Sequence, residues 1–132
     1  MPPQDRPLSP FLTIYRPEVT SVFSILHRLT GMAVALGAVV LAWWLLAAAV
    51  GPDYFEFVRG VFATLPGRLV LFGLVGSMVY HALNGIRHLI WDAGALFEKS
   101  QVMWSAWLIF AAAIALTLVL WYSIFGADMG LT

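Results

Sequence analysis

The sequence contains no cysteine and few charged residues. Only 11% of its 132 residues are Asp, Glu, Lys or Arg, whereas 61% are hydrophobic. The absence of cysteine excludes a disulfide, an iron–sulfur ligand and a haem thiolate, so histidine is the expected metal ligand. The scarcity of charge excludes a water-facing globular surface. The composition therefore predicts an integral membrane protein.

Three apolar blocks are long enough to cross a membrane, which takes about 20 residues each. We predict an all-α fold with transmembrane helices at roughly 22–50, 68–91 and 102–125, within one membrane domain over 22–132. The proline-rich residues 1–21 predict an irregular cytoplasmic segment without a cleaved signal peptide. The basic residues gather before the first helix and near the second loop, so the positive-inside rule places the N-terminus in the cytoplasm.

The segment between the first two spans has the pattern of a short amphipathic helix. Asp53 is a candidate N-terminal cap, with Glu56 three residues later. Apolar side chains then follow at helical spacing. They are Tyr54, Phe57, Val58 and Val61. The pattern predicts a short helix lying in the membrane interface.

The stretch His-Ala-Leu-Asn-Gly-Ile-Arg-His, which begins at His81, places ionisable groups inside an apolar segment. Such groups are costly in a bilayer and indicate function. At about 100° per residue, four residues fall on nearly one line along the helix. They are His81, Gly85, His88 and Asp92. Neutral imidazole is an axial haem ligand, and Gly85 leaves room for a porphyrin, so we interpret His81 as a haem b ligand. A histidine hydrogen-bonded to a neighbouring helix is the alternative that spacing leaves open.

A low-spin haem needs a second axial ligand at a matching depth. His27 lies near the start of the first span, and His88 lies on the same helix as His81. We therefore expect the second ligand to come from another chain.

A second polar group lies at the start of the first span. Its members are spaced by three and four residues, which places them on one helix face. They are Ser24, His27, Arg28 and Gly31. A quinone head needs hydrogen-bond donors to its two carbonyl oxygens, and Ser24 and Arg28 are suitable donors. The alternative is that Arg28 extends to lipid headgroups while Ser24 only caps the helix.

Three further polar residues follow His81 on the second span. Arg87 and His88 could bind haem propionates, or could serve only as topology signals. Asp92 could relay protons to a reduced quinone, or pair with Arg87 or His88. Spacing does not choose between these roles.

Three motifs, at 6–10, 24–31 and 81–92, together resemble the cytochrome b556 subunits of succinate dehydrogenase. They read Arg-Pro-Leu-Ser-Pro, Ser-Ile-Leu-His-Arg-Leu-Thr-Gly and His-Ala-Leu-Asn-Gly-Ile-Arg-His-Leu-Ile-Trp-Asp. The resemblance implies a membrane anchor of complex II that forms half of a heterodimeric haem b bundle. The implied partners are a second hydrophobic anchor, an iron–sulfur subunit, a flavoprotein subunit, ubiquinone and the lipid membrane, with no nucleic acid. Succinate oxidation would take place in the other subunits.

The resemblance also implies roles for individual residues. It makes His81 an axial ligand of haem b and places Ser24 and Arg28 in the ubiquinone pocket. It also implies that the haem propionates lie near His27, Arg87 and His88. The encoded Met1 without a transit peptide favours a bacterial inner membrane over a mitochondrial one. An anchor of a quinol:fumarate reductase, or a cofactor-free helical scaffold, remains the alternative.

Overall fold

The computed structural model describes residues 17–126, and this part of the chain folds into helices without a strand. The helices are α2 (Val19–Val50), α3 (Pro52–Ala63), α4 (Leu65–Asp92) and α5 (Lys99–Phe125). Three of them, α2, α4 and α5, are 32, 28 and 27 residues long and apolar enough to cross a membrane. The predicted all-α fold with three transmembrane helices is confirmed.

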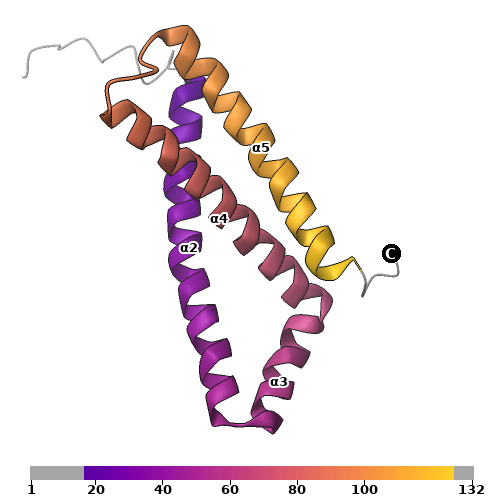
Figure 1. Cartoon of the computed structure of the whole chain (residues 1–132). Coiled ribbons are helices and arrows are strands. Elements are labelled where there is room, and N and C mark those ends of the chain that lie inside the picture. Colours follow the sequence, from indigo (N-terminus) through magenta and orange to yellow (C-terminus); the bar gives the residue numbers. More distant parts are fainter. Residues whose placement is uncertain (1–16, 127–132) are drawn as a thin grey trace, which may run out of the picture.

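The three long helices converge at one end of the molecule and separate at the other (Figure 1). The start of α2, the end of α4 and the start of α5 lie together, and α3 joins the far ends of α2 and α4. The buried core follows the same arrangement, with Phe23 from α2, Tyr80 from α4, and Ala106 and Ala113 from α5. The Phe23 ring meets the Trp107 ring edge-on at 5.3 Å. The core therefore lies where the helices converge.

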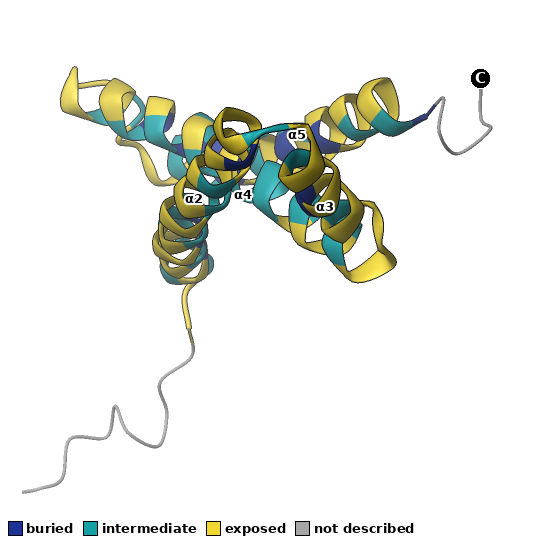
Figure 2. Cartoon of the chain, turned by 90° about the horizontal axis from the view of Figure 1, so that it is seen from below, coloured by how far each residue is buried: buried dark blue, intermediate teal, exposed yellow. Residues whose placement is uncertain are grey.

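Most large apolar side chains lie on the outside of the helices. Figure 2 shows exposed residues along every helix, and α2 buries only Phe23, Thr30 and Ala47. A helix with so much exposed apolar surface is stable in lipid or against further helices. The chain is thus built to be surrounded by a membrane and by partner helices.

Each long helix begins three residues before its predicted start. The Pro66–Gly67 pair suggests a turn, yet the Thr64 side chain accepts a hydrogen bond from the Gly67 N–H at 3.2 Å and α4 begins at Leu65. Proline is tolerated there because the first N–H groups of a helix lack partners. The start of α5 is fixed by a capping box between Glu98 and Gln101. The polar residues Thr64 and Glu98 therefore cap the starts of α4 and α5.

The predicted short helix between the first two spans exists as α3, but its details differ from the prediction. Gly51 is the N-cap, and Asp53 lies in the first helical turn. Glu56 forms an ion pair with Arg59 at 2.7 Å instead of closing a capping box. No side chain among the described residues caps the N-terminus of α3. The N-cap residue is Gly51, whose φ of 146° is a conformation that favours glycine.

Only part of the expected apolar stripe is buried. Val58 is fully buried, whereas Phe57 is 61% exposed. Tyr54 reaches α2, where its hydroxyl accepts a hydrogen bond from Trp43 Nε1 at 3.0 Å. One side of α3 therefore packs against the long helices, and Phe57 remains free to face lipid.

Candidate functional site

The structure brings the three histidines together where α2 and α4 cross. The rings of His27 and His81 are stacked with centroids 4.1 Å apart and an interplanar angle of 8°. The His88 ring lies 5.0 Å from that of His27. Two of these residues come from α4 and one from α2, so the cluster depends on the packing of the two helices. Helix periodicity placed His81 and His88 on one face, but it could not place His27 beside them.

His81 is oriented by the backbone of α2. Its Nδ1 lies 3.1 Å from the carbonyl oxygen of His27. A carbonyl can only accept a hydrogen bond, so we assign the ring proton to Nδ1. Nε2 then carries the lone pair and has no hydrogen-bond partner among residues 17–126. The hydrogen bond to a neighbouring helix therefore leaves His81 able to bind a metal.

Two glycines border the His81 ring and its helix. A methyl group on Gly31 would lie 2.9 Å from His81 Cε1, so only glycine allows α2 to approach the ring this closely. A methyl group on Gly85 would meet nothing within 4 Å. Gly85 lies one turn after His81 and borders open space on α4. The structure thus fixes the ring on one side and leaves space further along the helix.

One buried polar atom of the cluster lacks a hydrogen-bond partner among the described residues. His27 Nδ1 is buried and makes no hydrogen bond to the described residues. Buried polar atoms are almost always paired, because leaving one unpaired costs about 1–3 kcal/mol. His88 instead packs edge-on against the Trp91 ring, at 4.9 Å. The buried Nδ1 of His27 is therefore a hydrogen-bonding atom of the cluster that residues 17–126 leave unused.

Ser24 and Arg28 are both exposed, one helical turn apart on α2. Neither side chain makes a hydrogen bond or an ion pair within the described part of the chain. They lie within one turn of His27 along α2. Both side chains are available to a ligand or a partner subunit.

Arg87 lies apart from the histidines, between α4 and α5. It is only 4% exposed, and its Nε donates to Ser105 Oγ at 2.9 Å. Its Nη2 donates to the carbonyl of Val102 at 2.5 Å, and its Nη1 lies 3.5 Å from Asn84 Oδ1. The guanidinium also lies 4.1 Å from the centre of the Trp91 ring. Arg87 therefore joins α4 to α5.

Sequence reasoning gave no role to the two residues that hold Arg87 in place. Asn84 and Ser105 are among the most buried polar side chains, at 2% and 4% exposure. The available signal was the spacing of three between Asn84 and Arg87 in an otherwise apolar helix. The position of Ser105 on α5 needed the three-dimensional packing.

Asp92, the last residue of α4, is exposed and forms no ion pair with another residue of 17–126. The expected pairing with Arg87 or His88 is therefore absent. Arg87 is occupied on the α5 side of the helix, which explains why it does not turn toward the carboxylate.

No group of three or more His, Cys, Asp or Glu side chains among the described residues is arranged to hold a metal ion. The His81 ring instead has an Nε2 without a hydrogen-bond partner among residues 17–126, and Gly85, one turn further along α4, borders open space. This donor set suits a macrocycle that brings its own equatorial ligands.

Comparison with known proteins shows the family to which the chain is related. The sequence profile described as succinate dehydrogenase/fumarate reductase transmembrane subunit matches residues 2–120. The chain belongs to this family. A succinate dehydrogenase cytochrome b556 subunit of Rickettsia typhi is 38% identical over 116 residues, covering 88% of this chain and 90% of the relative. The corresponding subunit of Paracoccus denitrificans is 36% identical, covering 87% and 88%.

The family extends to a eukaryote. A succinate dehydrogenase cytochrome b560 subunit of Marchantia polymorpha is 37% identical over 124 residues, covering 87% of this chain and 88% of the relative. The resemblance seen in the sequence motifs is thus confirmed. Membership of the succinate dehydrogenase/fumarate reductase transmembrane family supports a membrane anchor of complex II, and the Rickettsia and Paracoccus relatives support a bacterial membrane protein.

Proposed function

We propose that this chain is the cytochrome b anchor of a succinate:ubiquinone oxidoreductase, and that it binds haem b and forms part of the ubiquinone site. Electrons would reach the quinone from the iron–sulfur subunit. The observation that carries the proposal is the orientation of His81, whose Nδ1 faces the His27 carbonyl while Nε2 is free. Ser24 and Arg28, exposed beside it, supply the donors for the quinone.

The residues present suit a haem b. His81 Nε2 would hold the iron, and haem, when bound, supplies one-electron transfer. The His27 and His81 rings are stacked at 4.1 Å, which leaves no room for a porphyrin between them. His27 therefore would not hold the iron together with His81. A second anchor subunit is the proposed source of that ligand.

The propionates of the haem need polar partners on this chain. His27 Nδ1 is buried and unpaired, and His88 lies beside it, so these two side chains are the best placed. Arg87 is the third proposed partner. Its Nε and Nη2 donate to α5, so Nη1, whose contact with Asn84 is the longest at 3.5 Å, is the group proposed to donate to a carboxylate.

The quinone head would accept hydrogen bonds from the Ser24 hydroxyl and the Arg28 guanidinium. Both groups lack partners within residues 17–126, and a guanidinium hydrogen bond to a developing oxyanion is among the stronger polar contacts. Two protons are taken up as the quinol forms. The iron–sulfur subunit and the second anchor are the proposed remaining walls of this pocket.

The test compares two electron acceptors for one purified complex. We expect Arg28→Ala to lower kcat/KM for ubiquinone reduction by succinate about tenfold to a hundredfold, because a charged hydrogen bond is lost. Ser24→Ala should act in the same direction with a smaller effect. Succinate oxidation by a water-soluble artificial acceptor should not change, because that reaction does not use this site.

Arg59→Ala is the matched control, since it removes an arginine at the other end of the molecule. Unchanged ubiquinone reduction in Arg28→Ala would contradict the proposed quinone site. A loss with both acceptors would show that Arg28 serves assembly of the complex instead.

A further inference from the structure

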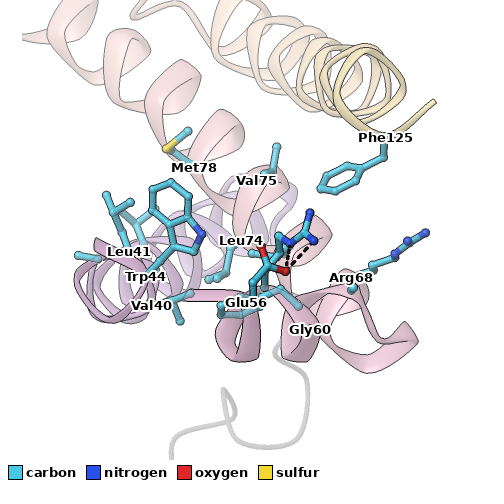
Figure 3. A pocket seen from close by; sticks show the side chains of 17 residues that line it. Val40, Leu41, Trp44, Glu56, Gly60, Arg68, Leu74, Val75, Met78 and Phe125 are labelled. Atoms are coloured by element: carbon cyan, nitrogen blue, oxygen red, sulfur yellow. Dashed lines mark hydrogen bonds and ion pairs between the residues drawn. The ribbon is translucent and has the colours of Figure 1, made fainter. Parts of the chain in front are cut away.

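A cavity of about 870 Å³ lies away from the histidines, between α2, α3 and the first half of α4. It occupies the region where the long helices separate, and Figure 3 shows its lining side chains. Its walls are mostly apolar, and the end of α5 adds Phe125. The apolar side chains named in Figure 3 are Val40, Leu41, Trp44, Leu74, Val75 and Met78. This volume lies within the range of about 300–1,000 Å³ typical of ligand sites.

The charged side chains of the cavity do not balance. Arg59, Arg68 and Glu56 line it, which leaves one positive charge in excess. Arg59 is paired with Glu56 at 2.7 Å. Arg68 has no such partner, and its Nε is buried without a hydrogen bond to the described residues. The cavity therefore holds a guanidinium whose buried Nε has no acceptor among residues 17–126.

The apolar walls and the excess positive charge of the cavity together indicate what kind of ligand it could bind. Leu41 and Met78 are more than half exposed, at 56% and 57%, so the apolar part of the cavity is open to the bilayer. The charged residues come from α3 and the first turn of α4, where the chain passes between two spans. A ligand with an acidic head at that level and long apolar tails would satisfy both parts. A water-soluble anion would leave the apolar walls uncovered.

We propose that this cavity binds an anionic phospholipid, with the phosphate on Arg68 and the acyl chains between α2 and α4. Arginine suits phosphate because its N–H groups can donate in pairs. The excess positive charge selects a headgroup with a net negative charge over a zwitterionic one. The site is separate from the proposed haem and quinone site.

The test is native mass spectrometry of the detergent-purified complex, titrated with dioleoyl phosphatidylglycerol or dioleoyl phosphatidylcholine. We expect the wild type to bind the anionic lipid about tenfold more tightly, a preference that one charged hydrogen bond can supply. Arg68→Gln should remove this preference. Lys99→Gln, which removes a cation at the start of α5, is the charge-matched control and should keep it.

A second variant tests the cavity without changing its charge. A methyl group on Gly60 of α3 would meet nothing within 4 Å, so Gly60→Leu adds bulk to the open space. We expect Gly60→Leu to lower binding of phosphatidylglycerol by about tenfold. An anionic preference that persists in Arg68→Gln, or unchanged binding of phosphatidylglycerol by Gly60→Leu, would overturn the proposal. Displacement of the lipid by ubiquinone at equal concentration, or an absence of preference in the wild type, would overturn it as well.

Discussion

At one end of α4, Arg87 is buried and joins α5 through Ser105 and the Val102 carbonyl; near the other end, Arg68 lines a cavity and its buried Nε has no partner among residues 17–126. Both are arginines on a helix that crosses a membrane, where an unsatisfied charge is costly. Arg87 is satisfied by neighbouring residues of α4 and α5, whereas Arg68 Nε has no acceptor within the described part of the chain. The comparison shows where this chain is complete and where it depends on its surroundings.

The tightly packed end is also where the predicted cofactor residues lie. Polar contacts there connect all three long helices, since Tyr80 donates to the Phe23 carbonyl of α2 while Arg87 donates to α5. A redox site needs its ligands held in a fixed geometry, which such contacts provide. At the other end the helices separate and apolar surface is left for lipid.

The largest effect is expected from breaking the packed end at Arg87. Arg87→Ala removes a buried guanidinium and leaves Asn84, Ser105 and the Val102 carbonyl with fewer partners. We expect a cost of about 3 kcal/mol, measured as a lower Tm of the detergent-purified complex. Arg59→Ala breaks an exposed ion pair and should cost less than about 1 kcal/mol. Equal Tm values for the two variants would remove the distinction between the ends.

An intermediate effect is expected from Gly31→Ala, which sharpens the comparison at the histidine cluster. The added methyl group would lie 2.9 Å from His81 Cε1, so either the ring or α2 must move. Overpacking of this kind costs about 1–3 kcal/mol. We expect a lower Tm together with a shifted haem band in the purified complex.

Gly73→Ala is its control, because a methyl group on Gly73 meets nothing within 4 Å. That variant should keep the haem band and change stability by no more than about 1 kcal/mol. A Gly31→Ala complex with the spectrum and Tm of the wild type would show that the close approach of α2 to His81 is not needed.

The smallest effect is expected from a pair of tyrosine hydroxyls, one at each end. The Tyr80 hydroxyl is buried and donates to Phe23 at 3.2 Å, whereas the exposed Tyr54 hydroxyl accepts from Trp43 at 3.0 Å. We expect Tyr80→Phe to cost about 1 kcal/mol and Tyr54→Phe less than about 0.5 kcal/mol. Thermal denaturation of the two complexes measures the difference. A larger loss for Tyr54→Phe would mean that the α3 end is the more rigid one.

Sequence periodicity predicted the helices well, because long apolar runs have few alternatives in a membrane. The three-residue shifts at their starts have local causes. Thr64 caps α4 and the Glu98–Gln101 capping box fixes the start of α5, each ahead of the predicted start. These residues were visible in the sequence, but a residue can be recognised as a cap only when the start of the neighbouring helix is known.

The site was predicted residue by residue rather than as a unit. Spacing along one helix related His81 to His88, and Ser24 to Arg28, but contacts between helices needed the crossing of α2 and α4. The His27–His81 stack and the position of Arg87 against α5 could not be derived from periodicity for this reason. The Arg68 cavity depends on how far the helices separate, which a sequence pattern does not encode.

The most direct measurement is a reduced-minus-oxidised spectrum of the purified complex from the wild type, His81→Ala and His88→Ala. Both variants remove a histidine ring that lies beside His27, but His88, as a proposed partner of a propionate, would not hold the iron. We expect a b-type band in the wild type, its loss in His81→Ala and its retention in His88→Ala, with all subunits present. An intact wild-type complex without haem, or a b-type band that persists in His81→Ala, would contradict the assignment of His81 as the haem ligand.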